Sequence, residues 1–160
     1  MNMLRRIAFA FFILALTATT GALAGPPVAT LTMPAPFGSS PVLTWRWGVR
    51  NDGITNPGSG GGGLGRVNFE ELSISRNADG QSPLFFKYVA TGLPLTTVVL
   101  VDGSTTITLT DVLVTNYFPV DTDAKDKDTP SETITFVFSK LAYTVNGVTT
   151  CFNIKTNQPC

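Results

Sequence analysis

The strongest constraint on the fold is a long run of alternating apolar and polar residues near the C-terminus, followed by a turn signal. Within 133–145, apolar side chains stand at positions 134, 136 and 138, and then at 141, 143 and 145. Alternation with a period of two is typical of a β-strand that buries one face. The pair Asn146-Gly147 is a preferred hairpin turn and predicts a return strand over 148–154. We therefore expect an antiparallel sheet built around this hairpin.

Similar patterns predict further strands on the N-terminal side of this hairpin. The expected strands span 28–33, 42–49, 66–75, 95–101 and 105–115. Asp102-Gly103 predicts a two-residue turn between the last two of them. Residues 25–41 contain five prolines, and a proline cannot donate a hydrogen bond to a ladder. At most one short strand, over 28–33, therefore fits in that segment.

In two of the predicted strands the apolar phase slips by one residue. One slip falls at Glu70-Glu71 and the other at Ser139-Lys140. Such a slip indicates a β-bulge or a strand that switches faces. We therefore expect an irregular ladder at both points.

One short helix is predicted at about residues 82–91. Ser82 is a good N-cap, Pro83 suits the first helical position, and Gly92 suits the position after the last turn. Lys87 points outward, and the apolar residues share the opposite face: Leu84, Phe85, Tyr88 and Val89. Many strands and one helix predict a mainly β fold, either a barrel or a sandwich.

Composition narrows the possible functions. The 160 residues include 11 basic and 11 acidic ones, so the balance does not favour nucleic acid as a partner. The sequence contains no histidine, which excludes His-ligated metals and nucleophiles activated by histidine. Two cysteines are too few for a structural zinc site or an iron–sulfur cluster. We therefore expect no cofactor and no nucleic-acid partner.

Residues 1–24 have the features of a secretory signal peptide. Two arginines precede the apolar run 7–16, and alanines stand three and one positions before a cleavage site between Ala24 and Gly25. Ten apolar residues rise only about 15 Å as a helix, roughly half a bilayer, so no stable membrane anchor is expected. An uncleaved anchor or an interfacial helix is the alternative. The pattern predicts a secreted or periplasmic protein.

Export would place Cys151 and Cys160 in an oxidising compartment, where a disulfide between them is expected. Closing this short loop contributes about 2.7 kcal/mol in the chain-entropy model. Free thiols are the alternative. The chain then divides into a signal peptide (1–24), a proline-rich segment (25–41), a β domain (42–150) and a disulfide-closed tail (151–160).

Two stretches look superficially like ligand sites. The glycine run 58–66 lacks the Gly-Lys-Ser/Thr of a phosphate-binding loop, and Arg66 opens a strand rather than a helix. The acidic stretch 121–128 could bind calcium, but Lys125 and Lys127 oppose a cation and the final glutamate of an EF-hand loop is missing. We expect a flexible loop and a solvated loop, and no metal site.

Two residue pairs could carry chemistry or binding. Glu70 and Glu71 are adjacent, so in a regular strand they face opposite sides, which is poor geometry for paired-carboxylate catalysis. Trp45 and Trp47 share one face, where core packing is expected and a sugar-stacking platform is the alternative. The sequence contains no recognisable catalytic motif, so we expect a protein that is not an enzyme.

Several collinear runs together resemble the haemolysin-coregulated protein (Hcp) family, the tube subunits of type VI secretion. The runs are WRWGV (45–49), GGGGLGRVNFEELSISRNADGQSPLFFKYVATG (60–92), TLTDVLVTNYFP (108–119) and PSETITFVFSKLAYTV (130–145). The resemblance implies a β-barrel of two sheets with one helix packed beside it. It also implies a homo-hexameric ring, a structural role without catalytic residues, and effector or spike proteins as partners.

The resemblance suggests ring contacts in the part of the chain that carries its motifs. The residues proposed for these contacts are Arg66, Asn68, Glu70 and Lys87. Two features depart from the family. Its usual opening strand is replaced by a shorter proline-rich segment, and the chain carries a signal peptide that tube subunits lack. Both departures bear on whether rings stack into tubes.

Two other functions remain open at this level. An extracellular binding module would use the barrel to hold a glycan or a partner protein, and exposed tryptophans at 45 and 47 would favour it. A hydrolytic effector would need carboxylates brought together by the fold, and the candidates are Glu70, Asp111 and Glu132.

Overall fold

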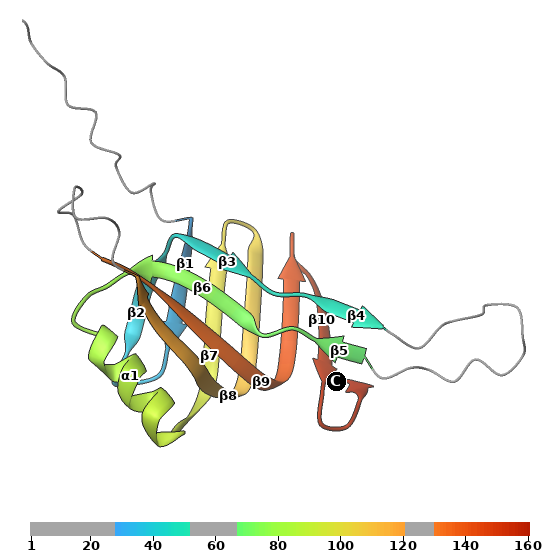
Figure 1. Ribbon diagram of the computed structural model, residues 1–160. Coiled ribbons are helices and arrows are strands. Elements are labelled where there is room, and N and C mark those ends of the chain that lie inside the picture. Colours follow the sequence, from blue (N-terminus) through green and yellow to red (C-terminus); the bar gives the residue numbers. More distant parts are fainter. Residues whose placement is uncertain (1–27, 52–66, 121–129) are drawn as a thin grey trace, which may run out of the picture.

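The computed structural model describes residues 28–51, 67–120 and 130–160. The strands are β1 (Ala29–Met33), β2 (Gly38–Val42), β3 (Thr44–Arg46), β4 (Val49–Asn51), β5 (Val67–Phe69), β6 (Leu72–Asn77), β7 (Pro94–Asp102), β8 (Thr105–Val120), β9 (Ser131–Val145), β10 (Val148–Asn153) and β11 (Gln158–Pro159). The helix α1 (Ser82–Thr91) lies beside the strands at one end of the molecule (Figure 1). Within these ranges no helix is both long and apolar enough to span a bilayer.

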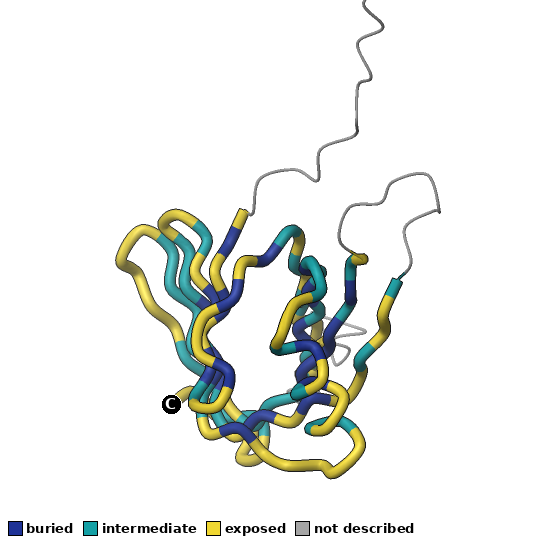
Figure 2. Tube along the Cα trace, turned by 90° about the vertical axis from the view of Figure 1, so that its left-hand side faces the viewer, coloured by how far each residue is buried: buried dark blue, intermediate teal, exposed yellow. Residues whose placement is uncertain are grey.

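The main sheet curls into a barrel. Its strands follow the order β11-β10-β9-β8-β7-β1-β2, while β6 pairs with both β9 and β3. One residue separates β2 from β3, and the amide of that residue, Leu43, donates to the carbonyl of Ser75 on β6 at 2.8 Å. The continuous segment β2–β3 therefore joins the β1 side of the sheet to the β6 side. The buried residues line the inside of this wall (Figure 2).

Strand β9 changes partner near its middle, and the predicted phase slip falls at that point. Its N-terminal part pairs with β6 over 131–136, and its C-terminal part pairs with β10 over 140–145. The ladder between β8 and β9 keeps one register through Ser139-Lys140, and its register shift lies on β8, between Val114 and Asn116. The slip thus marks a change of neighbour, with no bulge in β9 itself.

The slip predicted at Glu70-Glu71 is a bulge. Arg46 pairs with Ser73, and Val49 pairs with Phe69. Residues 47–48 therefore lie opposite 70–72, so the second strand has one extra residue, as in a bulge. The amide of Glu70 still donates to the carbonyl of Gly48 at 2.8 Å, so β3–β4 and β5–β6 form one long ribbon. We call its outer part, β4–β5, the arm (Figure 1).

Two strand predictions need correction. The single strand expected over 42–49 is divided among β2, β3 and β4, because the chain changes partner from β1 to β6 and then enters the arm. The proline-rich segment holds β2 as well as the expected short strand. Pro41 is tolerated there because, within the described part of the chain, β2 forms a ladder with β1 alone, so no ladder hydrogen bond is lost on its other side. Leu31 and Met33 of β1 are buried in the core of the barrel.

The helix has the predicted bounds but a different N-terminal cap. Gln81 occupies the N-cap position without a side-chain cap, and Ser82 is the first helical residue. The Ser82 hydroxyl instead accepts a hydrogen bond from the amide of Asp79 at 3.0 Å. Gly92 ends the helix in the left-handed conformation, φ 64°, as expected. Lys87 is exposed and Phe85 is buried in the core, in agreement with the predicted faces.

The two hairpin turns differ in how well they were predicted. Asn146-Gly147 connects β9 to β10, with both residues at positive φ, as the sequence predicted. The turn between β7 and β8 lies one residue later than expected, at Gly103-Ser104. Asp102 is paired with Thr105 in the ladder, because Gly103 rather than Asp102 takes up the left-handed conformation.

Candidate functional site

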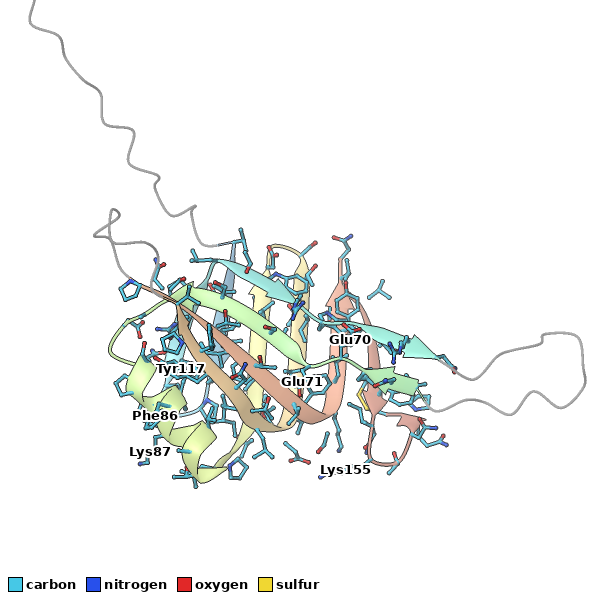
Figure 3. The ribbon with its side chains drawn as sticks, in the orientation of Figure 1. Glu70, Glu71, Phe86, Lys87, Tyr117 and Lys155 are labelled. Atoms are coloured by element: carbon cyan, nitrogen blue, oxygen red, sulfur yellow. A yellow bond between two sulfur atoms is a disulfide. The ribbon has the colours of Figure 1, made fainter. Side chains whose placement is uncertain are left out.

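The four proposed ring-contact residues occupy different places. Asn68 and Glu70 both line a hollow of about 490 Å³, which we call the polar groove. It lies along the ribbon, and its charged lining residues are Arg46, Arg50, Glu70 and Glu71. Lys87 lies on α1, well away from the labelled glutamates (Figure 3). Arg66 is outside the residues that the structure describes.

Several other predicted features also fall outside the described residues. They are the cleavage site at Ala24 and Gly25, the glycine run 58–66 and the acidic stretch 121–128. Among the described residues, no group of three or more Cys, Asp or Glu side chains is arranged to hold a metal ion.

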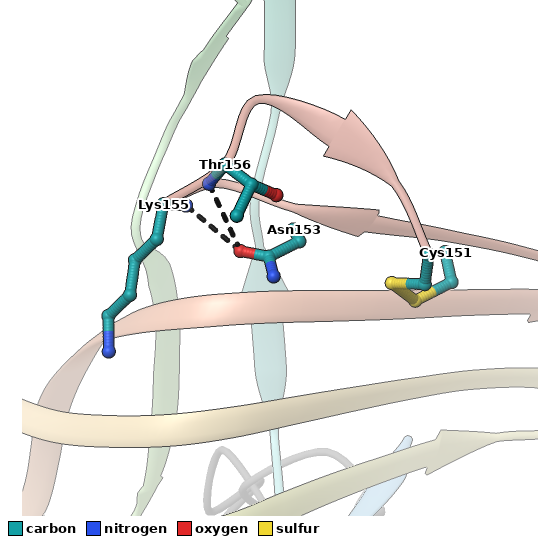
Figure 4. The surroundings of a disulfide bond; sticks show 5 residues. Cys151, Asn153, Lys155 and Thr156 are labelled. Carbon is teal, nitrogen blue, oxygen red and sulfur yellow. Dashed lines mark hydrogen bonds between the residues drawn. A yellow bond between two sulfur atoms is a disulfide. The ribbon is translucent and has the colours of Figure 1, made fainter.

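The two cysteines form a disulfide, Cys151–Cys160, which holds the C-terminal tail against β10. Their Cα atoms are 5.3 Å apart, and the amide of Cys160 donates to the carbonyl of Cys151 at 3.3 Å. Inside the tail loop, the Asn153 side-chain oxygen accepts hydrogen bonds from the amides of Lys155 and Thr156 (Figure 4). The tail is therefore an ordered part of the barrel end.

Both tryptophans are partly buried and pack against the core, in agreement with the core-packing interpretation. The indole N–H of Trp45 donates to a carboxylate oxygen of Asp102 at 2.9 Å. The Trp47 ring lies edge-on to Tyr143, with 5.3 Å between the ring centroids. Each ring is thus held by a specific contact within the barrel.

A second hollow was not foreseen from the sequence. It lies between the arm and the β9–β10 hairpin, measures about 640 Å³, and is called here the apolar groove. The arm contributes Val49, Val67 and Phe69, and the opposite wall includes Tyr143 and Phe152. The alternation of apolar and polar residues along each strand predicts which of these side chains point inward. That signal does not reveal that the arm folds over the hairpin.

A buried ion pair was also missed. Arg76 on β6 and Glu132 on β9 are both 0% exposed, and Nε of Arg76 lies 3.1 Å from Oε1 of Glu132. The Arg76 guanidinium also donates to the Ser40 hydroxyl and to the side-chain oxygen of Gln81, which ties β2 and the start of α1 to the pair. Burial, and then the negative charge of Glu132, raise the pKa of the nearby Tyr117.

The structure does not bring the three candidate hydrolytic carboxylates together. Glu70 lies at the bulge of the ribbon, on the exposed side of the barrel. Asp111 is exposed on β8, with its carboxylate 3.5 Å from the Lys155 ammonium. Glu132 is inside the barrel and is paired with Arg76. Three separate environments provide no acid–base pair of the glycosidase kind.

Comparison with known proteins agrees with this architecture. A family model described as "Type VI secretion system effector, Hcp" matches residues 37–145, more than half of the chain. A comparison with curated proteins found no match.

Solved structures of similar proteins share the fold. A structure described as a type six secretion system protein is 18% identical, with a TM-score of 0.74 over 82% of this chain and 98% of that chain. Hcp1 from Salmonella typhimurium is 25% identical, with a TM-score of 0.63 over 82% and 97%. Hcp2 from the same organism is 20% identical, with a TM-score of 0.61 over 81% and 98%. The chain therefore belongs to the Hcp family of type VI secretion, a family of structural tube proteins.

Proposed function

We propose that this chain is an exported Hcp protein that assembles into a homo-hexameric ring and acts by its shape rather than by catalysis. The match of the family model to residues 37–145, over a barrel of the Hcp fold, is the observation that carries the proposal. Secreted effector or spike proteins are the partners that such a ring would contact.

Export is proposed from the N-terminal sequence. Residues 1–24 have the composition of a signal peptide, with cleavage between Ala24 and Gly25. The Cys151–Cys160 disulfide supports this, because structural disulfides persist in secreted and periplasmic proteins and are rare in the cytosol.

A closed ring requires two different surfaces that fit each other on neighbouring copies. We place one of them at the polar groove, where Asn68 is exposed and both signs of charge are present along the ribbon. The second surface is proposed on α1, where Lys87 and Phe86 are exposed, at a distance from the groove (Figure 3). Opposite charges across such a contact would fix its register.

Light scattering after size-exclusion chromatography tests the proposal. The protein is expressed from its full-length reading frame and purified from the secreted or periplasmic fraction. A hexamer mass, and an N-terminus at Gly25 by mass spectrometry, are expected. A strict monomer at high concentration contradicts ring assembly. Purified protein that still carries residues 1–24 contradicts a cleaved signal peptide.

A charge reversal locates the contact. Glu70→Arg is expected to shift the mass distribution toward the monomer, because it replaces an anion that would face Lys87 of the neighbouring copy with a cation. Lys155→Glu, on the exposed C-terminal loop, is the matched reversal away from the groove and leaves the hexamer intact. Equal loss of hexamer in both variants would argue against the groove as the contact.

A further inference from the structure

The apolar groove has the form of a ligand site. Its volume of about 640 Å³ is within the range of small-molecule pockets, roughly 300–1,000 Å³. It is bounded on one side by the arm and on the other by the inward face of the β9–β10 hairpin, so two walls from distant parts of the chain face each other. Neither the family match nor the solved relatives assign a function to this groove.

Aromatic contacts between the walls keep the groove in shape. Phe69 on the arm packs against Phe152 on β10, with 5.3 Å between the ring centroids. Trp47, at the base of the arm, packs against Tyr143 on β9 at the same centroid distance. The disulfide holds Pro159 in place as part of the rim. A site that is already formed loses less conformational freedom when a ligand binds.

The lining determines the chemistry of the ligand. Among the residues that the structure describes, no Asp, Glu, Lys or Arg lines the groove, and the lining residues with polar side-chain groups are Tyr143, Thr150 and Trp47. A charged ligand would lose its hydration without gaining an ionic partner there. We propose that the groove binds one small, uncharged and largely apolar molecule, with its orientation set by these few polar groups.

Fluorescence of 1-N-phenylnaphthylamine, an uncharged aromatic dye, tests the proposal on the full-chain protein. We expect saturable binding of one dye per chain, together with quenching of Trp47 in a Trp45→Phe background. Val49→Glu places a charge in the groove at a side chain that is already 52% exposed, and is expected to weaken dye binding by about tenfold or more. Val148→Glu, at a 78% exposed position outside the groove, leaves the affinity unchanged.

Both variants are first compared with the parent protein by thermal unfolding, so that a loss of fold is not mistaken for a loss of binding. If Val49→Glu lowers the melting temperature, Val49→Ser replaces it, with weaker dye binding again expected.

Three results overturn the proposal. They are the absence of saturable binding, equal effects of the Val49 and Val148 changes, and binding that vanishes as the protein oligomerises. The last result would mean that a second copy covers the groove. Dye binding by a protein that stays monomeric would support the groove while contradicting the ring, so the two proposals can fail separately.

Discussion

Arg76 and Glu132 are cross-strand partners on β6 and β9, and their side chains meet in the interior of the barrel with 3.1 Å between Nε and Oε1. Both residues are fully buried. Arg76 is the ion-pair partner of Glu132, whereas the Arg76 guanidinium also pairs with the carboxylate of Asp79. Breaking a buried ion pair by removing one partner typically costs about 3–5 kcal/mol, since the remaining charge has no partner.

We therefore expect Glu132→Gln to lower the free energy of unfolding by up to about 3 kcal/mol, measured by urea denaturation, because Asp79 remains as a partner of Arg76. The matched change Glu71→Gln is at an exposed position and should stay within about 0.5 kcal/mol of the parent. The double change Arg76→Met with Glu132→Leu should recover part of the loss, because it removes both buried charges. A neutral Glu132→Gln would show that the pair does not stabilise the barrel.

Tyr117 makes the stability of the barrel depend on pH in the alkaline range. Burial and the charge of Glu132 raise the pKa of Tyr117 above the ordinary value of 10.0. The folded state therefore holds the phenol proton more tightly than the unfolded state. This contribution is complete below pH 10.0, and it decreases as the pH rises through the higher folded-state pKa.

The expected result is a steeper loss of unfolding free energy above about pH 10 in the parent protein than in Tyr117→Phe. Urea denaturation at a series of pH values from 8 upward measures the unfolding free energy of both proteins. Lysine titration affects both proteins equally, so it drops out of the difference between them. Parallel curves for the two proteins would contradict the raised pKa. Tyr143→Phe serves as a control at another partly buried tyrosine.

The parts of the fold that were predictable are those with local causes. The strands β7 to β10 and the helix follow from side-chain period and from turn or cap residues within a few positions. The division of 42–49 into separate strands was not predictable. It arises because the chain pairs with β1 up to Val42 and with β6 from Leu43 onward, and β1 and β6 lie far apart in the sequence. The proline content of residues 25–41 likewise predicted no strand at β2. Pro41 fits in that strand because β2 pairs with β1 on one side.

The sites show the same division. Glu132 stands two positions before Ile134 and Arg76 two positions after Ile74, so alternation places both on the inward face. That signal was available in the sequence, whereas their pairing required knowledge that β6 and β9 are neighbours. The apolar groove joins the arm to the C-terminal hairpin, and no local pattern predicts that contact. The disulfide was predictable because the chain contains only two cysteines.

Removing the disulfide is expected to release the tail. The double change Cys151→Ser with Cys160→Ser should lower the free energy of unfolding by up to about 2.7 kcal/mol, the loop-closure contribution of so short a loop. Urea denaturation of the variant, and of the parent with and without reductant, measures the effect. Parent protein in reductant should match the double variant. An unchanged midpoint in both would show that the tail adds nothing to the stability of the barrel.

Two glycines should respond differently to the same small substitution. A Cβ at Gly48 would lie 2.9 Å from Oε2 of Glu70, which is the free end of a flexible and exposed side chain that can move aside. A Cβ at Gly147 would meet no atom within 4 Å, but the backbone there has φ +80°, which side chains disfavour.

Gly147→Ala is therefore expected to destabilise the protein by about 1–2 kcal/mol, the cost of a left-handed conformation for an L-residue. Gly48→Ala should cost less than Gly147→Ala, because only the Glu70 carboxylate must move. Thermal and urea unfolding of the two variants measure this order. Combining Gly48→Ala with Glu70→Ala should remove whatever cost remains at Gly48, since no side chain then has to be displaced. The reverse order would mean that the bulge of the ribbon, rather than the β9–β10 turn, is the more constrained of the two backbones.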